Sequence, residues 1–310
     1  GFINITLSGA YIADYVSRMA ECEKYGVEEA KEPKTIIVDY GGPNIAKPLH
    51  VGHLRSAIIG ESIKRFGRYM GHKVIGDAHL GDYGRPLGFV VLEISKRYPE
   101  LPYFDSKYTG DYSELSLPIS NEDLETIYPL ASQKAKEDES YLEEGRIITA
   151  KIQNHERGYY DLWKKVVEIS KKDIKEVYDV LNTEFDLWLG ESDAAEYFDE
   201  LYSIFQEKNL LQDSEGAKIV DVSNENDNSP MPPLLFIKSN GTLSYETTDL
   251  ATILQRKKEN NPDEIWYVVD GRQALRFEQI FRATRMSKIV DDNVILEHVN
   301  FGTMNGKDGK

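Results

Sequence analysis

The sequence contains a single cysteine, Cys22, among its 310 residues. One cysteine excludes an intrachain disulfide and any zinc or iron–sulfur site built from cysteines, and it is typical of proteins in a reducing compartment. The sequence also has no apolar run near the roughly 18 residues that a membrane span needs, and no signal peptide opens it. These absences predict a cytoplasmic protein without a membrane partner.

Positive charge is also scarce. The chain has 37 basic and 53 acidic residues, a formal net charge of −16. Proteins that bind nucleic acid without specificity are usually basic, because neutralising phosphates supplies most of their affinity. We therefore expect any nucleic-acid partner to be held at a local site or by another domain. The chain starts at Gly1 and ends at Lys310 without a closing element, so we expect it to be a fragment.

The first hundred residues alternate between strand and helix patterns. Residues 35–42 are apolar and β-branched and predict a buried strand. Residues 72–82 and 86–98 predict a second strand and a second helix. Between the two strands a helix is predicted by apolar residues at helical spacing, followed by Gly71 at the usual C-terminal position: Leu54, Ile58, Ile63, Phe66 and Met70. This order predicts a parallel sheet with right-handed crossovers.

A long segment interrupts the alternation. Residues 99–125 predict irregular structure and residues 126–182 predict charged helices. One apolar stripe, which we expect to be core packing, comprises Leu162, Trp163, Val166, Val167, Ile174, Val177, Tyr178 and Leu181. The strand and helix patterns return at 234–238, 247–258, 264–270, 273–288 and 294–302. The prediction is one doubly wound parallel sheet split by an insertion far longer than an ordinary loop.

The most unusual cluster is PNIAKPLHVGHLRS, residues 43–56. In open α/β sheets, ligands bind beyond the carboxyl ends of strands, and this cluster follows the first strand. Pro48 suits the first turn of a helix, which would place His50 and His53 on one face. Gly52 would let a flat group lie against the backbone. Helix N-termini suit phosphates, and imidazoles can donate hydrogen bonds to charge developing on a transferring phosphoryl group. The cluster predicts a nucleoside triphosphate site.

Two other ligands fit this cluster poorly. A metal site lacks a third ligand at suitable spacing, so no protein-bound metal is expected. A dinucleotide site would require G-x-G-x-x-G in the first strand-to-helix turn, where it does not occur. Ordinary surface histidines remain the plain alternative.

The residues around this cluster resemble the signature region of class I arginyl-tRNA synthetases: VDYGGPNIAKPLHVGHLRSAIIGESI (38–63). The similarity continues, in family order, in GDYGRPLG (81–88), FDLWLGES (185–192), YETTDLATI (245–253) and WYVVDGRQALRFEQIF (266–281). The resemblance implies a Rossmann-like α/β fold, a doubly wound parallel sheet split by a largely helical connective insertion. It also implies that arginine is activated with ATP, which carries Mg²⁺, and transferred to the 2′-hydroxyl of the terminal adenosine of tRNA(Arg).

The resemblance implies four parts of the chain. Residues 1–30 would be a lead-in, the tail of an N-terminal domain that is missing here. Residues 31–98 and 234–310 would be the two halves of the catalytic domain, and residues 99–233 the connective insertion. The second half would stop before the K-M-S-K-S-equivalent loop, which we expect to begin near residues 306–310. The tRNA would bind through domains mostly absent from this chain.

The resemblance also assigns site residues. The catalytic set would be His50, His53 and Lys47, and the ATP-binding set His50, Gly52 and His53. A guanidinium needs carboxylates held in its plane, and Tyr245 and Asp249 are four residues apart, on one helix face. The arginine-binding set would be Asp39, Asn44, Glu191, Tyr245, Asp249 and Gln273. In the family, Glu191, Tyr245 and Asp249 match contacts to the guanidinium, while Asp39 and Asn44 match contacts at the α-amino end.

Taken one at a time, these residues also have plain interpretations. Asp249 could cap a helix or face solvent, Tyr245 could be a core aromatic, and Lys47 could be a solvated loop lysine. Asp39 could be structural and Gln273 an ordinary surface residue at a helix start.

Several features depart from the family pattern or imitate it. RMSKI (285–289) imitates the lysine-bearing loop, but it precedes the last predicted strand, so we interpret it as ordinary helix surface. Tyr83 stands where tryptophan is usual, Pro86 where glutamine is common, and Arg276 where histidine is usual. They leave room for an inactive or divergent paralogue that binds arginine or RNA. A different H-x-G-H nucleotidyltransferase is a further alternative, against which Glu191, Tyr245 and Asp249 argue.

Overall fold

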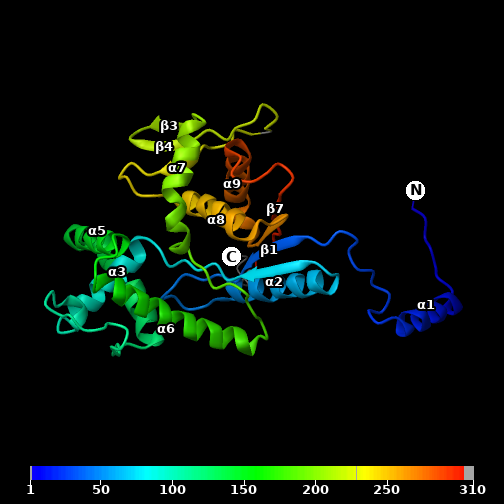
Figure 1. Cartoon of the computed structure of the whole chain (residues 1–310), viewed down its shortest axis with the longest axis horizontal. Coiled ribbons are helices and arrows are strands. Elements are labelled where there is room, and N and C mark those ends of the chain that lie inside the picture. The colour runs from blue at the N-terminus through cyan, green and yellow to red at the C-terminus, as the bar shows by residue number, and fades with distance from the viewer. Residues whose placement is uncertain (1, 228, 304–310) are drawn as a thin grey trace.

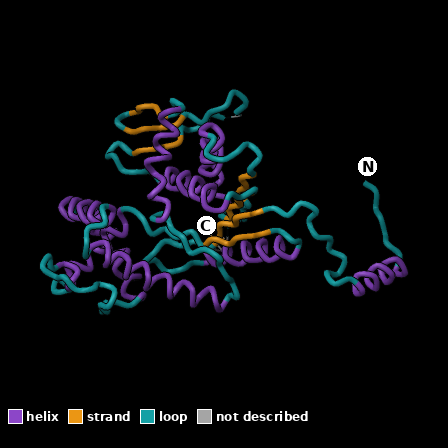
Figure 2. Tube along the Cα trace, in the orientation of Figure 1, coloured by secondary structure: helices purple, strands orange, loops and turns teal. Residues whose placement is uncertain are grey.

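Four parallel strands form the sheet that carries the site (Figures 1 and 2). The computed structural model describes residues 2–227 and 229–303. The strand order is β2-β1-β6-β7: β2 (Lys73–Asp77), β1 (Thr35–Tyr40), β6 (Glu264–Val268) and β7 (Ile295–His298). Ile36, Ile37 and Val38 of β1 are buried, as expected of a strand with a neighbour on each side and helices against its faces. The predicted strands at 35–42, 72–82, 264–270 and 294–302 are confirmed.

Helices connect these strands and bring their carboxyl ends to one edge. The helix α2 (Val51–Tyr69) joins β1 to β2, and α9 (Ala274–Ser287) joins β6 to β7. The helix α8 (Tyr245–Asn260) precedes β6 and lies above the sheet in Figure 1. The loops after β1, β2 and β6 therefore meet at one edge, where open α/β sheets bind ligands.

The segment between β2 and α8 is mostly helical. Its helices are α3 (Arg85–Arg97), α4 (Asn121–Glu137), α5 (Glu139–Gln153), α6 (Tyr159–Val180) and α7 (Phe198–Glu207), with short 3₁₀ turns η1 (Pro102–Phe104) and η2 (Asp193–Tyr197). The predicted core stripe on α6 is confirmed, because most of its members are buried. The helix α4 starts inside the segment predicted to be irregular. Ser120 caps it and Asp123 returns the bond, an N-terminal signal that the prediction overlooked.

The prediction that residues 234–238 belong to the main sheet was wrong. The strand β5 (Leu234–Ile237) pairs antiparallel with β4 (Ala217–Val220), which pairs antiparallel with β3 (Leu211–Ser214). The first two strands of this small sheet were not predicted. They are joined by Glu215 and Gly216, both at positive φ, which is the turn that suits a two-residue hairpin. An apolar run of four residues does not reveal which sheet it joins.

The apolar stripe that predicted α2 is not its buried face. Ile58 and Phe66 are 48% and 61% exposed, whereas the buried residues of α2 are Ser56, Ala57, Gly60, Glu61, Lys64 and Gly67. The helix approaches β1 so closely that a Cβ on Gly60 would lie 2.2 Å from Tyr40 Cγ. The Lys64 ammonium lies 2.9 Å from the Glu61 carboxylate. The Gly71 prediction is confirmed, since this residue follows the helix with φ +90°.

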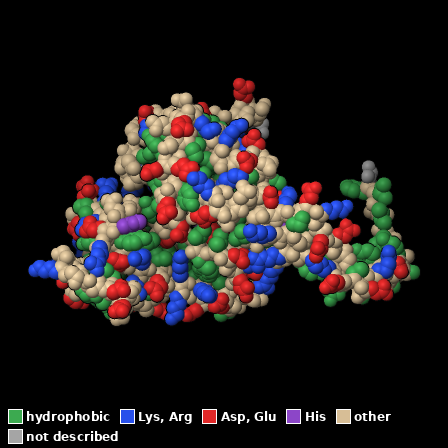
Figure 3. Space-filling model, in the orientation of Figure 1, with side chains coloured by type: hydrophobic (Ala, Val, Ile, Leu, Met, Phe, Trp, Pro, Cys, Tyr) green, Lys and Arg blue, Asp and Glu red, His purple; other side chains and the backbone are tan. Residues whose placement is uncertain are grey.

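The N-terminal segment lies apart from this body. The helix α1 (Gly9–Glu21) has no buried residue, and Figure 1 shows it at the end of an extended arm. Hydrophobic side chains are exposed along the arm in Figure 3, including Phe2, Ile3 and Ile5. Among the described residues, no helix is both long and apolar enough to cross a bilayer.

Candidate active site

A cavity of about 400 Å³ opens at the carboxyl edge of the sheet, beside the N-terminus of α2. Loops after β1, β2 and β6 and the starts of α2 and α9 contribute to its wall. Most of the residues predicted for the site line it: Asp39, Asn44, His50, Gly52, His53, Glu191, Asp249 and Gln273. Segments far apart in sequence thus place three imidazoles and four carboxylates around one space, since His79 and Asp270 line it as well.

The two histidines form a stacked pair at the start of α2. Their ring centroids are 3.8 Å apart, with 23° between the ring planes. The Gly52 amide donates to His50 Nδ1 at 3.1 Å, and the His50 amide donates to His53 Nδ1 at 3.3 Å. Because each Nδ1 accepts a hydrogen bond, the proton of each neutral ring sits on Nε2. The pair can therefore supply two Nε2–H donors.

Burial is the largest influence on His53. Together with the neighbouring His50 and Lys47, it lowers the pKa of His53 to about 4. The ring is therefore neutral across the physiological pH range. It can donate one hydrogen bond to phosphate oxygens without carrying a charge of its own.

The local backbone differs from the prediction in two respects. The helix begins at Val51, not at Pro48, and His50 is its N-cap residue. Gly52 makes room for the His50 ring itself, because a Cβ there would lie 2.9 Å from His50 Cε1. The Gly52 amide is bonded to His50 Nδ1 and the His53 amide to the His50 carbonyl, so the imidazoles rather than the amides of the first turn are the donors that this helix start offers.

Lys47 and Tyr245 do not line this cavity. The Lys47 ammonium lies over the Tyr128 ring of α4, 4.6 Å from its centroid. Tyr245 is the first residue of α8 and lines a neighbouring cavity of about 520 Å³, together with Tyr83 and Pro86. Glu191 lines both cavities and links them.

The acidic end of the site consists of Glu191 and Asp249. Tyr245 and Asp249 both lie on α8, as the four-residue spacing predicted. Burial and the charge of Asp249 raise the pKa of Glu191 to about 7. Burial also raises the pKa of Asp249, although Arg276 opposes this effect. Two carboxylates in such surroundings bind a cationic group strongly.

A guanidinium already contacts this acidic end. Arg276 Nη2 lies 2.5 Å from Asp249 Oδ2, and the guanidinium carbon lies 5.9 Å from the centroid of the Tyr245 ring. Burial by itself would lower the pKa of Arg276, but the Asp249 carboxylate outweighs this and raises it. The site is thus able to hold a guanidinium between a carboxylate and an aromatic face.

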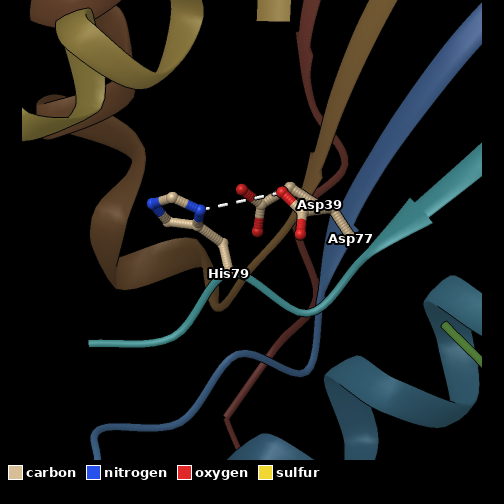
Figure 4. A group of neighbouring side chains, drawn as sticks. All are labelled: Asp39, Asp77 and His79. Carbon is tan, nitrogen blue, oxygen red and sulfur yellow. Dashed lines mark ion pairs between the residues drawn. The ribbon is translucent and has the colours of Figure 1, made fainter. Parts of the chain in front are cut away.

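A second buried cluster supports Asp39. Arg256, which is 1% exposed, donates to Asp39 Oδ2 at 2.6 Å and to Asp77 Oδ2 at 2.7 Å. Figure 4 shows Asp39, Asp77 and His79 converging, and their ligand-type atoms lie within 4.8 Å of one another. A metal ion could use such atoms, but Arg256 already supplies the positive charge that the two carboxylates need.

Three residues of this second cluster, Asp77, His79 and Arg256, were not predicted. Asp77 and His79 end the second predicted strand, so the rule that located His50 would also have found them. Arg256 lies seven residues after Asp249, two turns along the same helix face. These two spacings were available in the sequence.

Close backbone contacts fix the remaining wall. The Ile45 amide donates to the Gly81 carbonyl at 3.0 Å, and the Gly81 amide donates to the Pro43 carbonyl at 3.1 Å. A Cβ on Gly81 would lie 2.1 Å from Asn44 Oδ1, so glycine makes room for that amide. Gln273, which also lines the cavity, is exposed and ends the 3₁₀ turn η3 (Gly271–Gln273).

The segment RMSKI lies at the C-terminal end of α9, outside the cavity wall. Lys288 caps the helix in the left-handed conformation. This placement agrees with a helix rather than a catalytic loop, but the interpretation as ordinary helix surface was wrong in part, because Ser287 and Ile289 are buried. The loop expected near residues 306–310 lies outside the described residues.

Comparisons with known proteins identify the family of this chain. Residues 16–310 match the family model described as tRNA synthetases class I (R), catalytic domain. The arginine–tRNA ligase of Alkaliphilus oremlandii is 50% identical over 310 residues, which are 100% of this chain and 53% of that protein. The arginine–tRNA ligase of Agathobacter rectalis is 50% identical over 311 residues, 100% of this chain and 52% of that protein.

Solved structures show the same fold. The arginyl-tRNA synthetase of Plasmodium falciparum superposes with a TM-score of 0.73 at 28% identity, over 96% of this chain and 49% of that one. That of Thermus thermophilus gives 0.62 at 18% identity, over 94% and 52%, and supports the fold alone. The chain spans about half the length of the curated relatives it matches.

Proposed function

The chain belongs to the class I tRNA synthetase family for arginine, because its residues 16–310 match the catalytic-domain model of that family. From this premise we propose that it activates arginine with ATP and transfers it to tRNA(Arg). One observation carries the proposal: the cavity joins a half-buried pair of carboxylates, of which Asp249 contacts a guanidinium, to a pair of imidazole donors. These two ends match the two ends of the reaction, a cationic side chain and a phosphoryl group.

Arginine binds with its guanidinium at the acidic end. Glu191 and Asp249 face the guanidinium, and Tyr245 offers its ring beside it. Lysine carries one ammonium and would leave part of the carboxylate pair without a hydrogen-bond donor. Polar mismatches of this kind discriminate by about 10⁴-fold in sites built for them. The acidic pair therefore sets the specificity for arginine.

The α-amino end of arginine binds near the strand ends. Asp39 accepts from the α-ammonium group, and Arg256 holds the Asp39 carboxylate in place from behind. Asn44 and Gln273 contact the amino acid from opposite sides of the cavity. In this position the arginine carboxylate lies on the side of the cavity where α2 begins.

The first reaction forms a mixed anhydride. A carboxylate oxygen of arginine attacks the α-phosphorus of ATP, the bond to the bridging oxygen breaks, and pyrophosphate leaves. His50 and His53 donate through Nε2–H to the charge that develops on the phosphoryl oxygens. Mg²⁺ enters with ATP as part of the substrate, and we assign no protein ligand to it. Lys47 moves from Tyr128 to the phosphates.

The second reaction transfers the arginyl group. The 2′-hydroxyl of the terminal adenosine attacks the carbonyl carbon and gives up its proton, and AMP leaves with the electrons of the anhydride bond. The net charge of −16 suits RNA poorly, so contacts outside this site supply the affinity for tRNA(Arg). An enzyme of this function works in the cytoplasm.

Pyrophosphate exchange into ATP by the full-length protein tests the proposal, with and without tRNA(Arg). We expect exchange to depend on arginine and not on lysine. His53→Ala should lower the rate about 10²–10³-fold, the usual effect of removing one transition-state donor, with little change in arginine affinity. His155→Ala, an exposed histidine remote from the cavity, serves as control. Exchange driven by another amino acid, or an unchanged rate in His53→Ala, would contradict the proposal.

A further inference from the structure

Arg276 occupies the place that the proposed function gives to the substrate guanidinium. It lies in the first turn of α9, and its side chain is 32% exposed. Its Nη2 atom contacts Asp249 Oδ2 at 2.5 Å and the Tyr245 carbonyl oxygen at 3.5 Å. Its guanidinium also lies near the Tyr245 ring, and it lines the same cavity as Glu191 and Asp249.

We propose that Arg276 is an internal stand-in for the substrate guanidinium, and that arginine must displace it from Asp249 in order to bind. This inference rests on the proposed function, because it names a competitor within the same site. A carboxylate oxygen already engaged by one guanidinium cannot accept a second in the same geometry. Arg276 therefore lowers the apparent affinity for arginine.

The contacts of Arg276 allow it to be displaced. It holds Asp249 through a single nitrogen, and its Nε atom is buried without a hydrogen-bond partner among the described residues. Arg282, six residues further along α9, shows what a firm pair looks like: two of its nitrogens bind Asp227, at 2.8 and 2.7 Å. A free arginine can approach Asp249 with both terminal nitrogens, which gives the stronger geometry.

Arg276 also favours the charged forms of the two carboxyl groups until arginine arrives. Glu191 and Asp249 repel each other, while Arg276 and His79 lower the pKa of both carboxyl groups. Asp82 raises the pKa of Glu191, Asp39 raises that of Asp249, and Glu246 adds to the negative charge around Arg276. Without Arg276, the carboxyl pair would hold more of a proton near neutral pH, where the pKa of Glu191 is already about 7. Arginine would then have to expel that proton when it binds.

Calorimetry on this chain with Arg276→Gln separates a competitor from a structural support. The apparent affinity of a site is its intrinsic affinity multiplied by the fraction of molecules in which the site is free. If Arg276 occupies Asp249 in about nine molecules of ten, the apparent affinity for arginine is about tenfold lower. We expect Arg276→Gln to bind arginine about tenfold more tightly than the parent chain. Methylguanidinium, which has no α-amino or carboxylate group, should gain in the same way. Titration in two buffers of different ionisation enthalpy should show more protons released by the variant.

The matched control is Arg282→Gln, which removes an arginine of the same helix whose carboxylate partner lies outside the cavity. It should leave both affinities and the proton count unchanged. Equal or weaker binding of both ligands by Arg276→Gln would overturn the stand-in role, while arginine binding by the parent chain would leave the proposed function intact. Tighter methylguanidinium binding, with no arginine binding in any form, would support the stand-in and refute the proposed function.

Discussion

Glu191 shows how one residue can serve a ligand at the expense of the fold. Burial raises its pKa to about 7 from a usual value of 4.5. Between these two values the folded protein holds more protons at this group than the unfolded chain does. The free energy of unfolding therefore decreases as the pH rises from about 4.5 to about 7, and the full cost persists above pH 7. A cationic ligand removes that cost.

Glu191→Gln should remove this pH dependence. The amide does not ionise, so we expect the variant to be more stable than the parent at pH 8 and to show a flatter stability profile between pH 5 and pH 7. It should also lose arginine affinity, because half of the acidic pair is gone. Urea denaturation across this pH range, with and without arginine, measures both effects. Glu196→Gln, an exposed neighbour, is the control, and an unchanged slope in Glu191→Gln would disprove the account.

The sequence located the residues around the cavity better than it described their contacts. His50, Glu191 and Asp249 came from motif positions, and the fold brings them to one space. The stacking of the two histidines depends on backbone amides that no side-chain pattern encodes. The Arg276 contact joins the starts of two helices, 27 residues apart in sequence. Such pairs are set by tertiary packing and have no local signature.

At the scale of elements, the main sheet was predictable and its partners less so. The strands at 35–42 and 264–270 are apolar runs followed by helices, and that order nearly fixes a parallel arrangement. The strand β5 is also apolar, but it pairs with β4. The hairpin of β3 and β4 is too short for its alternating pattern to be recognised in the sequence. The helix α2 was predicted correctly, but its buried face was not. Its apolar stripe is exposed because glycines and an ion pair make the contact with β1.

Gly60→Ala should therefore separate α2 from the sheet. The new Cβ would lie 2.2 Å from Tyr40 Cγ, so the helix or the ring must shift. We expect a loss of about 1–3 kcal/mol in unfolding free energy, the usual cost of overpacking. The arginine-dependent exchange rate should also fall, because α2 carries His50 and His53. Gly9→Ala, where a Cβ meets nothing within 4 Å, is the control. Equal stability of both variants would show that the contact with Tyr40 is loose.

At the scale of the whole molecule, the body and the arm contribute unequally. The body buries three apolar clusters around the sheet, the connective helices and the small antiparallel sheet. In the arm no residue from 2 to 30 is buried. The charges mix over the visible face of the body in Figure 3, and no uniformly basic surface for RNA stands out there. The chain's chemistry therefore depends on the body.

Removal of residues 1–27 should leave the body intact. The principal contact that would be lost is the Lys24 ammonium, which donates to the Tyr69 carbonyl at 3.0 Å and to Glu29 at 2.6 Å. Exposed ion pairs contribute about 0–1 kcal/mol, and 1 kcal/mol shifts the Tm of a domain near this size by about 2–4 °C. The Ala30 amide, which donates to the Met70 carbonyl at 2.8 Å, is retained. We therefore expect a Tm within a few degrees of the parent and the same arginine affinity.

The truncated chain should also associate less at high concentration, since exposed Phe2, Ile3 and Ile5 are removed. Scanning calorimetry and arginine titration on both chains decide the matter: a Tm lower by about 10 °C or more, or a broadened transition, would mean that the arm stabilises the body.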